Sequence, residues 1–244
     1  AYSPHTVDVE YVDRCYHESP DDLRKEVQRQ IDRAEEARYD YDAIVLGYGL
    51  CSNGLVNIEA RRTPLVIPRA HDCITLLLGS KERYNEEFQA EPGTYYYTPG
   101  WVEREGTRKE RTSVQGEAAR EKIYAEYVEK YGEDNAKYLM ETLHAWYKNY
   151  ARAVYIHMGL VRFPEAEEQA RKVAQEYRWR FEETQGDLRL IKEMVEGQWR
   201  DDEFLTVEPG RRIVGAYDDN LVVQSAEGAC VELAPRLRSE RWAE

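Results

Sequence analysis

The sequence predicts an α/β protein with a mostly parallel open sheet, helices on both faces of that sheet and a tyrosine-rich helical insertion. Short apolar runs at residues 43–46, 65–67 and 153–156 are each followed closely by glycine or proline, which is typical of buried parallel strands. Stretches with apolar residues at helical spacing lie between these runs. Strands that alternate with helices indicate a parallel sheet covered on both faces.

Length and composition favour one globular unit. We expect the 244 residues to form a single domain spanning 1–244, with the helical insertion at about 112–150. Hydrophobic residues make up 42% of the chain and charged residues 33%, which is typical of a folded protein. No sequence repeat and no low-complexity linker divides the chain.

The charge and the apolar pattern argue against two classes of partner. The formal net charge of −13, from 47 acidic and 34 basic side chains, would repel a nucleic-acid backbone. No stretch approaches the roughly 20 apolar residues of a membrane span, and residues 1–4 lack the features of a signal peptide. Four scattered cysteines do not form a disulfide scaffold, so we expect a reducing, cytoplasmic location.

The remaining elements follow from local signals. Residues 7–12 alternate like a half-buried strand, and Ser19 with Pro20 predicts the start of a helix over 20–38. Gly132 separates two helical stretches within 112–149. Further helices are predicted at 74–78, 81–88, 164–179 and 187–195, and further strands at 94–97, 204–207 and 221–223.

Cysteine and histidine follow several of these strands. In an open parallel sheet, ligands bind beyond the carboxyl ends of the strands, so residues in those loops are brought to one edge. Thiolate and imidazole are ligands that zinc prefers. The sequence therefore predicts a zinc site with ligands drawn from Cys51, His71, Cys73, His157 and His17.

Other interpretations of the same residues stay open. The spacing His71-x-Cys73 is short for two ligands of one ion, so one of the pair could instead support the other. Alternatively, Cys51 and Cys73 are buried small hydrophobic residues and His71 is hydrogen-bonded in the core. An iron–sulfur cluster or a corrinoid cobalt is a less favoured occupant of the same site.

Substrate-binding residues are predicted beside the metal ligands. The glycine-rich loop through Gly47, Tyr48 and Gly49 could hold an anion with its backbone N–H groups, or it could be a tight turn. Arg69 could bind a carboxylate or phosphate, or pair with Asp72. Trp101 could form a wall of the pocket or pack in the core.

The segments GYGLC, PRAHDCITLLLGSKERY and TPGW resemble the uncharacterised family numbered sixteen thirty-eight among the domains of unknown function. The resemblance covers most of the chain. It places Cys51, His71 and Cys73 in signature segments and His17 in a recurrent His-x-x-Pro position. It also implies an occurrence mainly in methanogens and anaerobic bacteria, often beside genes of corrinoid-dependent methyltransferases.

Three functional hypotheses follow. The leading one is a zinc-dependent metal-binding protein in anaerobic one-carbon or corrinoid-linked metabolism, with a small-molecule substrate or cofactor. The second is a non-catalytic module that binds a corrinoid, or methyltransferase components, through the tyrosine-rich helices. The third is a metal-free enzyme that uses Cys51 or Cys73 as a nucleophile beside His71.

Overall fold

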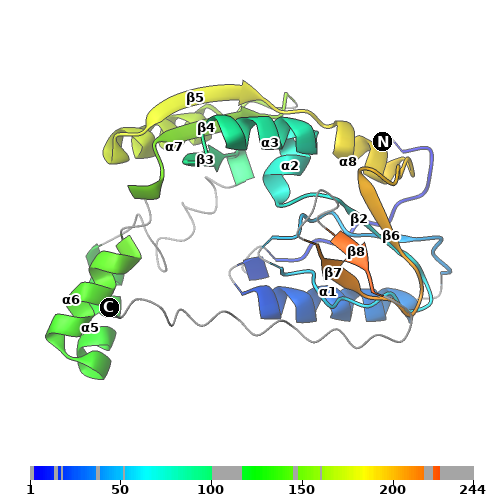
Figure 1. The fold of residues 1–244 in the computed structure, drawn as a ribbon, viewed down its shortest axis with the longest axis horizontal. Coiled ribbons are helices and arrows are strands. Elements are labelled where there is room, and N and C mark those ends of the chain that lie inside the picture. The colour runs from blue at the N-terminus through cyan, green and yellow to red at the C-terminus, as the bar shows by residue number, and fades with distance from the viewer. Residues whose placement is uncertain are drawn as a thin grey trace. The chain divides into compact units, whose positions relative to one another are not determined.

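The computed structural model describes residues 3–13, 16–17, 19–36, 39–51, 53–100, 117–144, 148–159, 161–216 and 222–225. Its internal contacts form two compact units. The first unit combines Ala1–Lys81 with Leu188–Glu244, and the second unit is Glu82–Asp187. Figure 1 labels the elements of both units. Whether the chain behaves as the single domain expected from its sequence stays a prediction.

The first unit is built on a three-stranded sheet with the order β1–β2–β6. Strand β2 pairs with β1 in parallel and with β6 in antiparallel orientation. A separate antiparallel pair is formed by β7 and β8. The elements of this unit are α1 (Pro20–Glu35), β1 (Ile44–Val45), β2 (Leu65–Pro68), α2 (Cys73–Leu78), α8 (Arg189–Val195), β6 (Phe204–Val207), β7 (Ile213–Gly215) and β8 (Val222–Gln224).

Successive side chains of β2 point to opposite faces of the sheet, and both faces are covered. Leu65 and Ile67 belong to the apolar cluster that contains the buried stripe of α1. Val66 belongs to a second cluster with residues of α2 and α8. Helices therefore lie on both faces of this sheet, which explains why β2 is a continuous apolar run.

The second unit contains a fully parallel sheet with the order β3–β4–β5. Its central strand β4 is buried along almost its whole length. The elements are α3 (Lys81–Ala90), which begins at the unit boundary, β3 (Thr94–Tyr97), α5 (Glu117–Tyr131), α6 (Glu133–His144), β4 (Arg152–His157), α7 (Pro164–Tyr177) and β5 (Arg180–Gln185).

Helix α7 covers one face of the parallel sheet. Its buried alanines and Val173 share an apolar cluster with Tyr97, Ala153 and Tyr155. On the opposite face, the nearly buried Arg152 pairs with Glu87 of α3 at 2.7 Å. The side chains of Ala153, Tyr155 and His157 therefore point to the α7 side.

The tyrosine-rich interval contains two helices, as the sequence predicts. Gly132 separates α5 from α6 and has a φ of 80°, a conformation that glycine adopts without steric cost. The two helices pack against each other. Their described surface includes the exposed side chains of Tyr131 and Tyr138.

The α/β class and the open sheets are confirmed, and Ser19 caps α1 by accepting the Asp22 N–H. The strand expected at 7–12 is wrong, since the described backbone there pairs with no sheet. The expectation of one sheet is also corrected, because the described strands form three sheets. Strands β5 and β7 lie in segments for which the sequence predicts no strand.

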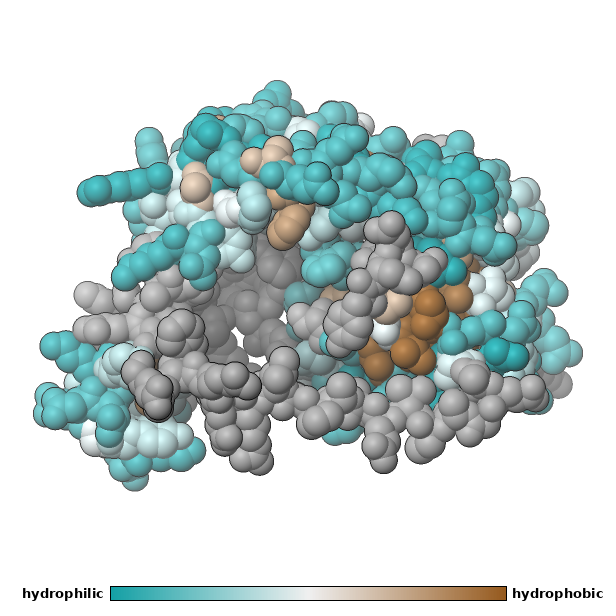
Figure 2. All heavy atoms as spheres, viewed as in Figure 1, coloured by the Kyte–Doolittle hydropathy of each residue, from teal (hydrophilic) through white to brown (hydrophobic). Residues whose placement is uncertain are grey.

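Among the described residues, no helix has the length and hydropathy needed to cross a bilayer. Figure 2 shows that the described residues on the visible face are mostly hydrophilic, as the charged composition leads us to expect.

Candidate metal centre

Three side chains that can bind a metal ion meet at the carboxyl end of the parallel sheet in the second unit. His157 is the last residue of β4, Glu183 lies on β5, and Glu167 lies in the first turn of α7. One ligand atom from each residue lies within 4.8 Å of the other two. Within the described part of the chain, this is the one such group of His, Cys, Asp and Glu.

The register of the sheet explains why these groups converge. Tyr155 is the partner of Glu183 in the β4–β5 pairing, so both side chains point to the α7 face. His157 lies two residues after Tyr155 and points to the same face. The helix that follows β4 then carries Glu167 over this corner of the sheet.

The three groups are joined by short polar contacts. His157 Nε2 lies 3.1 Å from Glu183 Oε2. Arg171 donates to the other Glu183 oxygen at 2.7 Å and to Glu167 at 3.4 Å. The arginine also lies over the ring of Phe181, with its guanidinium carbon 4.2 Å from the ring centroid. The ligand atoms are thus held in place from two sides.

Hydrogen bonds with His157 and then Arg171 lower the pKa of the Glu183 carboxyl. Glu183 is therefore ionised at neutral pH, which is the form that binds a cation. Its side chain is 38% exposed and that of His157 is 26% exposed, so solvent and ions have access to the group.

A buried hydroxyl lies next to the group. Tyr155 is 1% exposed, and its hydroxyl has no hydrogen-bond partner among the described residues. Burial raises the pKa of Tyr155, and the negative charge of Glu167 raises it further. Its ring packs edge-on against His157, with 4.9 Å between the centroids. An unsatisfied buried hydroxyl is costly, so this one is available to a bound water or ligand.

The cysteine loops of the first unit form a different arrangement. The N–H of Cys51 donates to the carbonyl of His71 at 3.1 Å, and the backbone of Cys73 lies close enough to Cys51 to act on the pKa of its thiol. The loops that carry the two cysteines therefore lie side by side. Both cysteines are free and partly exposed.

The predicted zinc set of four ligands does not form around these thiols in the described structure. His71 is turned toward Asp72, with 3.4 Å between Nδ1 and the carboxylate. His17 is exposed, and His157 belongs to the second unit. The carboxyl-end rule gathers ligands within one sheet, and the strands before Cys51 and His157 lie in different sheets.

Both thiols are protonated at neutral pH. Burial, and next the charge of Asp72, raise the pKa of Cys51. Burial and the neighbouring Cys51 raise the pKa of Cys73 to about 12. A nucleophilic cysteine requires thiolate, so these shifts disfavour the metal-free enzyme hypothesis.

Three of the predicted substrate-binding residues, Arg69, Gly49 and Tyr48, make contacts within the first unit, and substrate binding by them stays a prediction. Arg69 donates to the carbonyls of Asp201 and Val222. Gly49 allows a close approach of two loops, because a Cβ there would lie 2.5 Å from the backbone of Asp72. Tyr48 packs against the apolar core. Positive φ falls on Cys51 and Asn53 in place of Gly47 or Gly49, and Trp101 lies outside the described residues.

The sequence pattern indicates His157 as a candidate ligand and gives no sign of the two glutamates that lie beside it. The chain has 47 acidic residues, so an acid on a charged helix or strand carries no signal of its own. To place Glu183 beside the end of β4, one must know the register of β5 against β4, and the sequence predicts no strand at β5.

Comparison with known proteins gives one family. The family model described as "Protein of unknown function (DUF1638)" matches residues 11–195, which is most of the chain. No curated protein and no solved structure gives a match. The matched segment contains all three residues of the metal group.

Proposed function

Given that the chain belongs to the DUF1638 family of proteins of unknown function, we propose that it binds a divalent metal ion through His157, Glu167 and Glu183. The observation that carries this proposal is the convergence of one imidazole and two carboxylates within 4.8 Å. Zinc is the ion that we propose, because imidazole nitrogen and carboxylate oxygen are both regular zinc ligands.

The ligand number favours a site with an open position. Three protein ligands leave the fourth tetrahedral position of zinc to water or substrate, as in catalytic zinc sites. Bound zinc would polarise a substrate carbonyl or lower the pKa of a bound water. The Tyr155 hydroxyl, which has no described partner, can donate a hydrogen bond to an oxygen held beside Glu167.

The alternative is that the same residues form only an ion-pair network. Arg171 already contacts both glutamates and would compete with a cation for them. The two alternatives, a metal site and an ion-pair network, predict different zinc binding by an Arg171→Met variant. If the group is a metal site, Arg171→Met removes a competing charge and zinc affinity stays or rises. If the group is only a network, neither protein binds zinc stoichiometrically.

The direct test is a zinc titration of chelator-treated protein by calorimetry. We expect one zinc ion per chain, and we expect Glu183→Gln to weaken binding by about tenfold or more, because a ligand is lost. Lower pH should weaken binding in the unaltered chain as protons compete for the ligands.

Glu182→Gln is the matched control. Glu182 is the neighbour of Glu183 on β5, points to the opposite face and pairs with Arg152 and Arg180. The substitution removes the same charge from the same strand but should leave zinc affinity unchanged. Equal affinities of the Glu183→Gln variant and the unaltered protein would refute the proposed site.

A second candidate function is binding of a corrinoid by the tyrosine-rich helices. A concavity on α5 and α6 is lined by Tyr127, Tyr131, Asn135, Tyr138 and Leu139. Aromatic side chains of this kind can pack on a planar macrocycle. We also propose a place in one-carbon metabolism and an interaction with methyltransferase components, and both proposals rest on the family resemblance. A shift in cobalamin absorbance on mixing, lost in Tyr131→Ala, would support this candidate, and an unchanged spectrum would count against it.

A further inference from the structure

Arg171 lies beside the proposed metal ligands and carries donors that these ligands do not use. It stands one turn after Glu167 on α7 and donates to Glu167 at 3.4 Å and to Glu183 at 2.7 Å. Both hydrogen bonds come from one nitrogen, Nη2. Within the described part of the chain, its Nε and Nη1 make no hydrogen bond, and the side chain is 45% exposed. Two nitrogens of the guanidinium are therefore left for a ligand.

The guanidinium is also held by a contact that does not involve the glutamates. Its carbon lies 4.2 Å from the centroid of the Phe181 ring, and arginine stacks well on an aromatic face. Phe181 is two residues before Glu183 on β5, so both side chains lie on the α7 face of the sheet. Glu183 faces Arg171 with Oε1 and His157 with Oε2. One carboxylate oxygen can therefore bind a cation while the other keeps Arg171 beside it.

The charges around the three ligands balance only when no cation is bound. Arg162 and Arg171 pair with the carboxylates of Glu167 and Glu183, so these positive and negative side chains cancel. An imidazole that binds a metal ion is neutral. A divalent ion would thus add two positive charges that none of these described side chains offsets. The loaded site would therefore attract an anion.

A buried donor beside the ligands points to the same kind of occupant. Tyr155 is 1% exposed, and its ring packs edge-on against His157, with 4.9 Å between the centroids. Its hydroxyl has no hydrogen-bond partner among the described residues. The O–H needs an acceptor, which a metal ion alone cannot be. A ligand that brings oxygen atoms to the metal would satisfy it.

We propose that the metal-loaded site binds a small-molecule substrate through an oxyanion group, a carboxylate or a phosphate. One oxygen of this group takes the open position on the metal, and another accepts from Arg171. Carboxylate and phosphate share the chemistry that an arginine fork recognises, which is two negatively charged oxygens on one atom. This binding rests on the proposed function, because it requires the ion held by His157, Glu167 and Glu183.

The test uses the full chain loaded with cobalt(II) in place of zinc, since zinc has a filled d shell and gives no visible spectrum. Acetate and inorganic phosphate are titrated as anionic probes, and imidazole is titrated as a neutral probe. We expect all three to change the cobalt absorbance. In Arg171→Met we expect binding of the tighter anion to weaken about tenfold or more, and imidazole binding to stay unchanged. The tighter of the two anions identifies the substrate group.

Arg162→Met is the matched control. Arg162 also pairs with Glu167, but its side chain is 74% exposed, so water screens its charge. The substitution removes the same charge as Arg171→Met and should change anion affinity by no more than about twofold.

The outcomes separate the substrate group from the metal site. Equal anion affinities of the Arg171→Met variant and the unaltered chain would overturn the proposal. An equal loss of imidazole binding would also count against it, because the substitution would then disturb the metal itself. A cobalt-loaded chain whose spectrum ignores both anions would exclude the oxyanion and leave the metal site standing. A chain that takes up neither cobalt nor zinc would refute both.

Discussion

At the scale of single residues, glycine decides how the cysteine loops meet. Gly47 and Gly49 both precede Cys51, and the sequence alone does not distinguish them. The structure does, because a Cβ at Gly49 would lie 2.5 Å from the Asp72 backbone, whereas one at Gly47 would lie 3.5 Å from the Met194 methyl group. Backbone cannot yield as a flexible side chain can.

Gly49→Ala is therefore expected to lower the free energy of unfolding by about 1–3 kcal/mol, because the two loops must separate. Gly47→Ala is the control in the same loop, and we expect its stability to change by less than about 0.5 kcal/mol. Urea unfolding followed by circular dichroism measures both. Equal effects of the two substitutions would mean that the close approach at Gly49 is unimportant.

Residue types also explain what the sequence could and could not predict about the site. Cysteine and histidine are rare, so their positions after predicted strands carry a signal, and the loops of Cys51 and Cys73 do lie side by side. Glu167 and Glu183 carry no signal of their own, because the chain contains many other acidic residues. Whether His157 follows a strand of the same sheet as the cysteines depends on which strands pair, and the sequence of a single strand does not show its pairing partner.

At the scale of secondary-structure elements, continuous apolar runs predict buried strands, whereas polar strands show no pattern that predicts them. Strands β2 and β4 are buried and were predicted closely. Strand β5 is largely polar and exposed, and it is held by its pairing with β4 and by ion pairs with Arg152 of β4 and Arg171 of α7. The segment at 7–12 alternates as a strand should, yet no described strand pairs with it. An alternating apolar pattern predicts which face of a strand is buried, but the segment joins a sheet only where a partner strand pairs with it.

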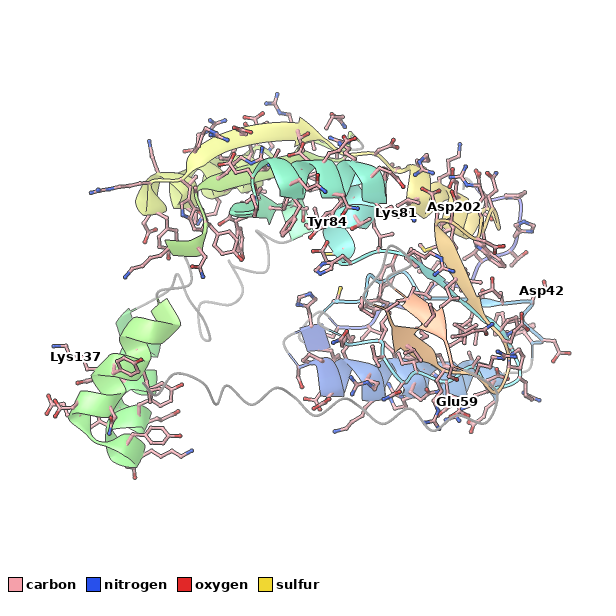
Figure 3. All side chains as sticks on the ribbon, in the orientation of Figure 1. Asp42, Glu59, Lys81, Tyr84, Lys137 and Asp202 are labelled. Carbon is pink, nitrogen blue, oxygen red and sulfur yellow. The ribbon has the colours of Figure 1, made fainter. Side chains whose placement is uncertain are left out.

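Helix α8 is joined to β6 through Glu203, which is 7% exposed. The carboxylate accepts from Arg189 at 2.6 Å and also pairs with Arg200. The Arg189 hydrogen bonds, followed by those of Arg200, lower the pKa of Glu203 from 4.5 to about 2. In the same region Lys81 donates to the Asp202 carbonyl at 2.8 Å, and Figure 3 labels both residues.

Because the folded pKa of Glu203 is depressed, its contribution to stability is complete above pH 4.5 and is lost as pH falls toward about 2. Glu203→Gln should cost about 2 kcal/mol at neutral pH and should flatten the fall in stability across that window. Asp202→Asn is the control, since Asp202 is 74% exposed and 3.9 Å from Arg200. Urea titrations at several pH values measure both, and parallel curves for all three proteins would contradict the expectation.

At the scale of the whole molecule, the two units have separate apolar clusters. The described core residues around β2 come only from the first unit, and those around β4 with α7 come only from the second. Each cluster can in principle be lost without the other.

Hydrogen exchange tests this arrangement. We expect Glu203→Gln to increase exchange in peptides from β2 and β6 and to leave peptides from β4 and β5 unchanged, because the substitution weakens only the first unit. Mass spectrometry of peptic fragments gives the measurement. A uniform increase in all four strands would instead support the single cooperative domain that the sequence predicts.

The pairing of β2 with β6 has a consequence for biosynthesis. The ribosome releases β2 long before β6, since the whole second unit is translated between them. Until then the nascent chain carries an apolar strand with one open edge, the kind of segment that aggregates or recruits chaperones. A chain whose translation slows or stops after Asp187 and before β6 should therefore form an insoluble product.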